Sequence, residues 1–173
     1  MRPHKHFPVD TLSEGLVEVQ TRKLIDAEIY ELTSFDMPEI TSDNGWLFDW
    51  QKELLAGDRK AYKIIVKNNP VIQGLISIED RKTFLFLPLI ETAPHNLGQK
   101  KQYKNAPKNL IAFACKRSFE SGYDREVAFR PKTKLIAHYK KELEAELLPG
   151  GQMFISSENA HKLVSLCYKN FKL

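Results

Sequence analysis

Residues 61–91 read AYKIIVKNNPVIQGLISIEDRKTFLFLPLIE, and this stretch decides the fold. Its β-rich runs fall at residues 61–67, 71–79 and 83–91, and polar turns separate them at Asn68–Pro70 and Asp80–Lys82. Three consecutive strands joined by short turns predict an antiparallel meander. Pro88 lies inside the third run. Because proline cannot donate to a sheet ladder, we expect this strand to bulge or to leave a neighbour there.

After the meander, apolar residues recur at helical spacing. The first predicted helix covers residues 106–121, with Pro107 near its first turn and Gly122 just past its end. Its apolar face is formed by Leu110, Ile111, Ala114, Cys115, Ser118 and Phe119. This helix is predicted to cover the sheet.

Two more helices and two short strands complete the second half of the chain. A four-residue spacing predicts one helix, which ends before Pro149 and carries Leu135, Tyr139, Leu143 and Leu147. A C-terminal helix is predicted within residues 156–173, opened by Ser157. The short strands are predicted at residues 126–129 and 153–155.

Before the meander, residues 24–32 fit either a strand or a short helix. A helix capped by Asp43 or Asn44 and ended by residues 56–58 is then predicted from the spacing of Trp46, Leu47, Trp50, Leu54 and Leu55. The order of elements in a chain of 173 residues predicts a single domain of the α/β (α+β) class, with one sheet covered by helices.

Composition excludes several classes of protein. With 42% hydrophobic and 28% charged residues, the chain has the balance of an ordinary soluble domain, and no apolar run approaches the ~20 residues that cross a bilayer. No secretory signal is recognisable, and two cysteines are too few for a disulfide framework. A cytoplasmic location is therefore expected, and no His, Cys or carboxylate set has metal-ligand spacing.

Charge is unevenly divided along the chain. Residues 1–60 carry 7 Lys and Arg against 12 Asp and Glu, whereas residues 61–173 carry 19 against 10. The basic part suits an anionic partner, either the phosphates of a cofactor or a nucleic acid.

The order of elements over residues 61–155 resembles the GNAT N-acetyltransferase superfamily. Val71–Ile76 is similar to the family's third strand, which commonly contains a glycine, and Thr83–Glu91 is similar to its fourth. Lys101–Ala106 lies where that family has an Arg/Gln-x-x-Gly-x-Gly/Ala turn before a long helix, and Tyr139 lies in the place of a frequent catalytic tyrosine. The resemblance implies a mixed, mostly antiparallel sheet with helices on both faces.

The signature motif itself is degenerate. The turn reads KQYKNA, so that Ala106 keeps the final small position and Lys104 replaces the glycine. Residues 94–100 add an extended stretch before the turn. An asparagine that often precedes the family's tyrosine is absent, and Lys132 stands in about its place.

By this resemblance the chain binds acetyl-CoA as co-substrate. The diphosphate would lie at the start of the helix at Ala106, where free N–H groups and the helix dipole favour an anion, with Lys100 and other lysines around it. The peptide-like pantetheine arm would pair with the splayed end of the fourth strand. The implied contacts are Leu89, Ile90, Glu91, Thr92, Lys101, Gln102, Tyr103, Lys104, Asn105, Ala106, Lys108 and Asn109.

Acetyl transfer to an amine needs a base, an oxyanion donor and an acid for the departing thiolate. The resemblance assigns the acid to Tyr139, although a core tyrosine of the apolar stripe is the alternative. Glu91 is the candidate base and Glu79 the second candidate. The N–H of Glu91 or of Thr92 is the candidate oxyanion donor.

The sequence therefore predicts an N-acetyltransferase acting on an amine, and its acidic first third suits a cationic acceptor. One alternative is an inactive GNAT-fold binding or regulatory module, which the altered turn favours. Another is a nucleic-acid-associated protein using the lysine-rich loop, although no array of aromatic and basic residues supports it. The acceptor, the acyl chain and the choice between monomer and homodimer stay open.

Overall fold

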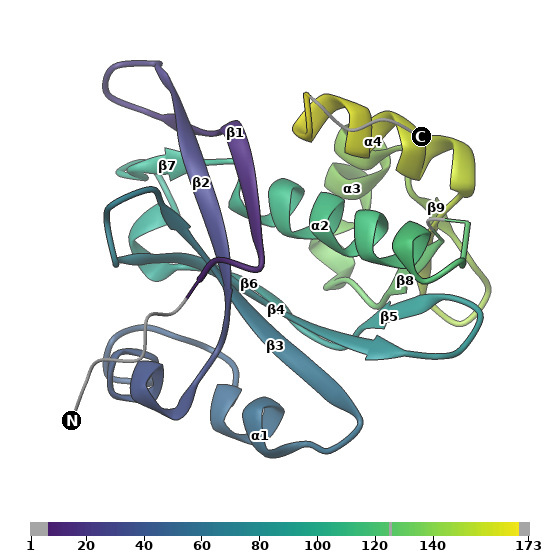
Figure 1. The fold of residues 1–173 in the computed structure, drawn as a ribbon, viewed down its shortest axis with the longest axis horizontal. Helices are drawn as coiled ribbons and strands as arrows, with labels where there is room; N and C mark the ends of the chain where they lie inside the picture. Colours follow the sequence, from purple (N-terminus) through teal and green to yellow (C-terminus); the bar gives the residue numbers. More distant parts are fainter. Residues whose placement is uncertain (1–6, 125, 170–173) are drawn as a thin grey trace.

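The computed structural model describes residues 7–124 and 126–169, and within them a single ten-stranded sheet (Figure 1). Its strands are β1 (Asp10–Glu18), β2 (Leu24–Glu31), β3 (Arg59–Val66), β4 (Ile72–Asp80), β5 (Leu85–Leu87), β6 (Ile90–Thr92), β7 (Tyr103–Lys104), β8 (Val127–Phe129), β9 (Glu146–Leu147) and β10 (Met153–Ile155). Their order is β7-β1-β2-β3-β4-β5-β8-β10-β9, and β6 pairs with β4. Only β5 and β8 pair in parallel, so the predicted mixed, mostly antiparallel sheet is confirmed.

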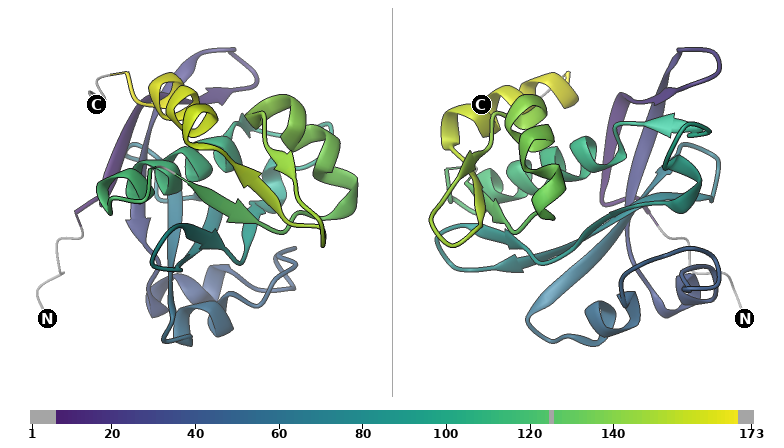
Figure 2. Two further views of the ribbon diagram at one scale, coloured as in Figure 1. Left: turned by 90° about the vertical axis from the view of Figure 1, so that its right-hand side faces the viewer. Right: turned by 180° about the vertical axis from the view of Figure 1, so that it is seen from behind.

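Helices cover both faces of this sheet (Figure 2). One face carries α2 (Ala106–Glu120), α3 (Ile136–Leu143) and α4 (Ser157–Cys167), and the other carries α1 (Trp50–Leu55) and the 3-10 helix η1 (Ser34–Glu39). Short 3-10 helices η2 (Pro94–Asn96) and η3 (Thr133–Leu135) lie in connections. No helix among the described residues is long and apolar enough to span a bilayer.

The sheet separates two apolar clusters. Successive side chains of a strand point to opposite faces, so Leu75 of β4 belongs to the cluster with Trp50, whereas the next residue, Ile76, belongs to the cluster with Leu110 and Phe113. Leu75, Ile76, Leu110 and Phe113 are fully buried, and Trp50 is almost so. Burial on both faces explains why β4 reads as a nearly continuous apolar run.

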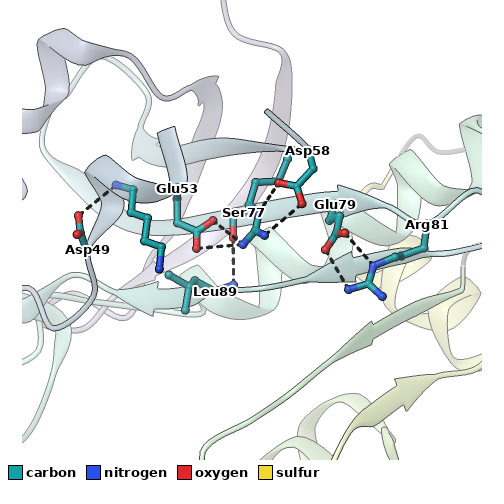
Figure 3. Close-up of polar contacts among 9 residues, drawn as sticks. Asp49, Glu53, Asp58, Ser77, Glu79, Arg81 and Leu89 are labelled. Atoms are coloured by element: carbon teal, nitrogen blue, oxygen red, sulfur yellow. Dashed lines mark hydrogen bonds and ion pairs between the residues drawn. The ribbon is translucent and has the colours of Figure 1, made fainter. Parts of the chain in front are cut away.

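The predicted meander is confirmed as β3, β4 and the segment that holds β5 and β6. The predicted irregularity at Pro88 is also present, because Ile76 pairs with Ile90 and Glu79 pairs with Phe86, which leaves one extra residue on the third run. The side chain of Ser77 compensates for this bulge. Its hydroxyl accepts a hydrogen bond from the N–H of Leu89 at 3.0 Å (Figure 3).

Gly74 allows α2 to lie close to β4. A Cβ atom at this position would meet the Cβ of Ala106, the Cδ1 of Leu110 and the carbonyl oxygen of Glu91, each at 3.3 Å. These distances are shorter than ordinary van der Waals contact. The glycine of the family-like third strand therefore sets the position of the first turn of α2.

The helix predicted around Trp46 begins later than expected. α1 starts at Trp50, where the side chain of Asp49 accepts a hydrogen bond from the N–H of Lys52, so the cap is neither Asp43 nor Asn44. The N–H groups of Leu47 and Phe48 bind a distant carboxylate instead of continuing a helix. The expected end at residues 56–58 is confirmed.

One other boundary differs from the sequence prediction, and two segments that it left open are now defined. α3 ends at Leu143 because Glu144 adopts a left-handed conformation (φ 51°), and Leu147 lies in β9 rather than in the helix. The C-terminal helix ends at Cys167, and residues 170–173 lie outside the described part of the chain. Residues 24–32, which fitted a strand or a helix, form β2.

Candidate active site

A groove lies where the sheet opens between β6 and the end of β8. β5 and β8 stay paired from Leu85 with Val127 to Leu87 with Phe129. Beyond this point β6 pairs only with β4, and the chain after β8 is unpaired. This opening forms a cavity of about 280 Å³, which is called the groove. It is lined by Leu47, Phe48, Leu87, Pro88, Leu89, Ile90, Glu91, Thr92, Leu97, Pro107, Phe129, Arg130, Pro131, Lys132, Lys134, Leu135 and Tyr139.

The backbone of β6 presents unpaired groups to this groove. Ser77 N donates to Leu89 O at 2.9 Å and Ala93 N donates to Gln73 O at 3.1 Å, so the odd-numbered residues of the strand exchange hydrogen bonds with β4. The N–H and C=O groups of Ile90 and Thr92 consequently point away from β4, where no described strand pairs with them. Of the two expected oxyanion donors, the N–H of Thr92 faces the groove and that of Glu91 faces β4. This edge can accept a peptide-like group as an added strand.

The first turn of α2 begins beside the same opening. Asn105 precedes it with a left-handed φ of 78°, and no described side chain caps the helix start. The N–H groups of Ala106 and Lys108 therefore have no intrahelical acceptor, while Pro107 has no N–H. Pro107 itself lines the groove. The positive end of the α2 dipole is thus uncapped and next to the groove, which favours an anion.

The lysine-rich segment before α2 is not one open turn. Tyr103 and Lys104 form β7 and pair with β1, and Gln102 O accepts a hydrogen bond from Val19 N. The side chains of Lys101, Gln102 and Lys104 remain exposed. The backbones of Gln102 and Lys104 are therefore committed to the sheet and the N–H of Tyr103 to Asn96 Oδ1, so the free N–H groups offered to a phosphate are those at the start of α2.

Asn109, one of the predicted cofactor contacts, is directed into the protein. Its side-chain amide donates to Gly15 O and to Asn105 O, both at 2.7 Å, and the residue is 1% exposed. These bonds fasten the irregular part of β1 to the first turn of α2. The carboxamide has a structural role here, because it cannot also reach a ligand in the groove.

Tyr139 of α3 lines the groove as expected. Its ring packs edge-to-face on Phe129 with the centroids 5.1 Å apart, and burial raises the pKa of its hydroxyl. Among the described residues the hydroxyl has no hydrogen-bond partner. A buried, protonated hydroxyl at the edge of a cavity is suited to donate a proton.

Glu91 also lines the groove, but its carboxylate is held by three donors. Oε2 accepts from Leu47 N at 2.7 Å, and Oε1 accepts from Phe48 N at 3.3 Å and from the indole Nε1 of Trp50 at 2.8 Å. The residue is 7% exposed. Binding a proton would displace at least one of these donors, so the geometry describes an anchor for the loop before α1.

Three solved acetyltransferase structures show how this arrangement compares. Nourseothricin acetyltransferase matches with a TM-score of 0.53 at 12% identity, over 76% of this chain and 98% of that chain. Dodecameric spermidine N-acetyltransferase from Vibrio cholerae matches with 0.53 at 14%, over 76% and 94%. A GNAT-family acetyltransferase from Staphylococcus aureus Mu50 matches with 0.51 at 12%, over 76% and 99%.

The chain has the GNAT fold. No protein-family model matches its sequence, and no curated protein does. The fold expected from the order of strands and helices is therefore supported by three-dimensional arrangement and not by sequence identity. At these identities the likeness establishes the fold and leaves the reaction to be argued from the groove.

Glu79, the second candidate base of the GNAT reading, lies outside the groove. It pairs with Arg59 and Phe86 toward the end of β4, and its carboxylate forms an ion pair with Arg81 at 3.0 Å (Figure 3). It does not line the cavity. Glu79 is therefore brought together with neither Tyr139 nor the edge of β6.

Sequence reasoning missed part of the basic rim of the groove in this GNAT fold. Arg130 and Lys134 line it together with Lys132, which was noted only as the replacement for an asparagine. The signal was present, because three cations fall within five residues directly after a predicted strand.

A buried polar network was also missed. Asn96 donates to Gln73 Oε1 at 2.8 Å and accepts from Tyr103 N at 2.9 Å, and His95 Nε2 lies 2.8 Å from the same Gln73 oxygen. Burial lowers the pKa of His95. The network ties β4 to β7 through η2 and so fixes the connection that leads to α2. No local pattern indicates it.

Proposed function

We propose that this protein is an acyl-CoA-dependent N-acyltransferase that transfers an acetyl group from acetyl-CoA to an amine. One juxtaposition carries the proposal: the uncapped start of α2, the unpaired backbone of Ile90 and Thr92, and the hydroxyl of Tyr139 all border one groove. These features suit a diphosphate, a pantetheine arm and a departing thiolate, respectively. The acetyltransferases that share the fold support the same class of reaction.

Binding of acetyl-CoA would use backbone groups more than side chains. The N–H groups of Ala106 and Lys108 and the dipole of α2 would receive the diphosphate, and the exposed Lys101 and Lys104 would add positive potential. The amide groups of pantetheine would hydrogen-bond with Ile90 and Thr92 as an added strand. Leu89 and Glu91 line the same path.

In the transfer step, the amine nitrogen attacks the thioester carbon and the C–S bond then breaks. The N–H of Thr92 is oriented to stabilise the oxyanion, and Tyr139 donates its proton to the thiolate sulfur. The described lining contains no carboxylate besides Glu91, so the proton of the amine passes to water. We therefore expect the rate to rise with pH as the acceptor amine deprotonates, and to fall only where Tyr139 ionises, above the usual tyrosine pKa.

A thermal shift with acetyl-CoA tests cofactor binding. The wild-type protein should be stabilised by acetyl-CoA, and the Lys101→Glu/Lys104→Glu variant should be stabilised much less. Lys140→Glu/Lys141→Glu is the matched control, since these exposed lysines of α3 belong neither to the groove lining nor to the segment that leads into α2. Absence of any shift in the wild-type protein would end the cofactor assignment.

Release of free thiol from acetyl-CoA, measured over a panel of amines, tests the reaction. Tyr139→Phe should lower kcat by about 100-fold or more while leaving the acetyl-CoA shift intact. A shift without turnover on any amine would favour the binding or regulatory module. A nucleic-acid role would instead require binding that weakens steeply with salt.

A further inference from the structure

One side of the groove, where Leu47, Phe48 and Lys132 line it, lies on the face of the sheet that carries α1 and is called the α1-side mouth. Arg130 directly follows the last residue of β8, and continued alternation of side chains places it on the face opposite Phe129 and Tyr139. Leu47 and Phe48 lie on that face, because their backbones bind the carboxylate of Glu91. This mouth is opposite the side on which Tyr139 lies, so an acceptor can enter there while the cofactor occupies the α2 side.

Positive charge dominates this mouth. Arg130, Lys132 and Lys134 line the groove, all three are exposed, and none forms an ion pair with a described carboxylate. The single carboxylate in the lining is that of Glu91, which three N–H donors already satisfy. A cationic acceptor would therefore meet three like charges and no available counter-charge.

Two of the cations are held in place by neighbouring groups. Arg130 Nη1 donates to Gly150 O at 2.7 Å, which leaves its other N–H groups for a ligand. The Nζ atom of Lys132 lies 5.1 Å from the centre of the Phe48 ring, a cation–π contact across the mouth. Side chains fixed in this way lose less freedom when they bind an anion.

The acidic first third of the chain does not offset this charge. Asp10 pairs with Lys116, Asp36 with Lys63, and Glu53 with Arg59. These carboxylates are engaged in ion pairs away from the groove lining. No carboxylate of residues 1–60 lines the groove, so the cationic acceptor expected from the sequence charge would find no counter-charge from this part of the chain there.

We infer that the acceptor is an amine that also carries an anionic group, a carboxylate or a phosphate, bound by Arg130 and Lys132 at the α1-side mouth. This inference rests on the proposed acyl transfer. The anion would hold the acceptor so that its amine points inward, toward the Thr92 N–H and Tyr139. The two anionic groups share one chemistry, since each is an oxyanion that arginine and lysine recognise.

The test uses pairs of amines that differ only in the anionic group. Glycine is compared with glycinamide, and glucosamine 6-phosphate with glucosamine, by thiol release at fixed acetyl-CoA, with spermidine as a cationic amine. We expect kcat/KM for the anionic member of at least one pair to be about tenfold higher or more, as charge-assisted hydrogen bonds provide. The pair that shows the preference separates carboxylate from phosphate.

Variants then test whether Lys132 is responsible for the preference for the anionic amine. Lys132→Glu should abolish it mainly through KM for the anionic amine, with the acetyl-CoA thermal shift unchanged, whereas Lys140→Glu should leave it intact. Equal or better turnover of the neutral members, or of spermidine, would overturn the inference while the acyltransferase assignment stands.

A binding measurement decides the case in which no amine is turned over. N-acetylglycine and N-acetylglycinamide, and likewise N-acetylglucosamine 6-phosphate and N-acetylglucosamine, are titrated by thermal shift with and without saturating CoA. Stabilisation by an anionic analogue that Lys132→Glu removes supports the anion site. Equal stabilisation by the neutral analogues, or none by either anion, contradicts it whatever the fate of the catalytic proposal.

Discussion

Replacing Glu91 by glutamine preserves the size of the side chain but removes one of its two acceptor oxygens. Oε1 accepts from Phe48 N and Trp50 Nε1, whereas Oε2 alone accepts from Leu47 N at 2.7 Å. A glutamine can place its oxygen at the Oε1 position and keep two of the three bonds. Its NH₂ group then faces the N–H of Leu47, so two hydrogen-bond donors meet and neither has an acceptor there.

The cost follows from the number and kind of bonds lost. A hydrogen bond to a charged partner contributes about 1.5–3 kcal/mol, and the two bonds that glutamine keeps become weaker neutral ones. Leu47 is 68% exposed, so its freed N–H can reach water and part of the cost is recovered. We expect Glu91→Gln to lower the free energy of unfolding by about 2–3 kcal/mol, and Glu91→Ala by about 4 kcal/mol because it leaves all three donors without an acceptor.

Urea denaturation measures this loss as a lower midpoint at an unchanged m-value. Glu79→Gln is the matched control, because its exposed ion pair with Arg81 should contribute less than about 1 kcal/mol. If Glu91 were the catalytic base, Glu91→Gln would abolish thiol release and leave the unfolding free energy at the wild-type value. That result would refute the assignment of this carboxylate as an anchor.

The first turn of α2 and the C-terminal helix provide further tests. Asn109→Ala should lower the free energy of unfolding by about 1–2 kcal/mol, and Asn109→Asp by more, because a carboxylate cannot donate to Gly15 O and Asn105 O. Urea denaturation measures the order of the two variants. An Asn109→Asp variant as stable as the wild-type protein would contradict the structural role of this amide. Gly74→Val should cost about 2 kcal/mol and reduce the acetyl-CoA thermal shift, because the new side chain displaces the first turn of α2; an unchanged shift contradicts this. Burial raises the pKa of the Cys167 thiol from 9.0 to about 11. The free energy of unfolding is therefore undiminished below pH 9, and it falls as pH rises through 11 because the thiol ionises more readily in the unfolded chain. The loss is about 2–3 kcal/mol, and Cys167→Ala should show a shallower decline of stability between these pH values in denaturation at graded pH.

Most of the sheet and the two helices α2 and α4 could be predicted because their signals are local. The bulge follows from Pro88, and the end of α2 follows from Gly122, which has a left-handed φ of 81°. Ser156 caps α4 by accepting from Asn159 N, one residue before the predicted helix start. In each case the residue that determines the boundary lies within a few positions of it.

The errors arise where a distant residue determines the local structure. Residues 46–49 have helical spacing, but Glu91, more than 40 positions away, captures the N–H groups of Leu47 and Phe48. Tyr103 and Lys104 resemble a turn in isolation and become a strand only because β1 offers an unpaired edge. Neither partner can be recognised from the segment itself.

The residues that border the groove were predicted from the resemblance to the GNAT fold more than from the chemistry of their side chains. The approach of Ala106, Thr92 and Tyr139 to one opening depends on that topology, and their spacing in the sequence does not encode it. The roles of Glu91 and Asn109 depend on hydrogen bonds to residues far along the chain. Residue type alone therefore suggested a base and a ligand contact where the geometry has an anchor and a structural amide.

Alternation along β6 separates two functions within three residues. The backbone of Ile90 and Thr92 faces the groove, whereas the side chain of Glu91 holds the loop that forms the α1-side mouth. Because the same strand fixes the proposed cofactor edge and the proposed acceptor wall, loss of the Glu91 anchor should disturb both together. A charge change at Lys132 should alter only the wall of the α1-side mouth, where the acceptor is proposed to bind. Variants at these two positions can therefore distinguish a defect in the frame of the site from a defect in acceptor recognition.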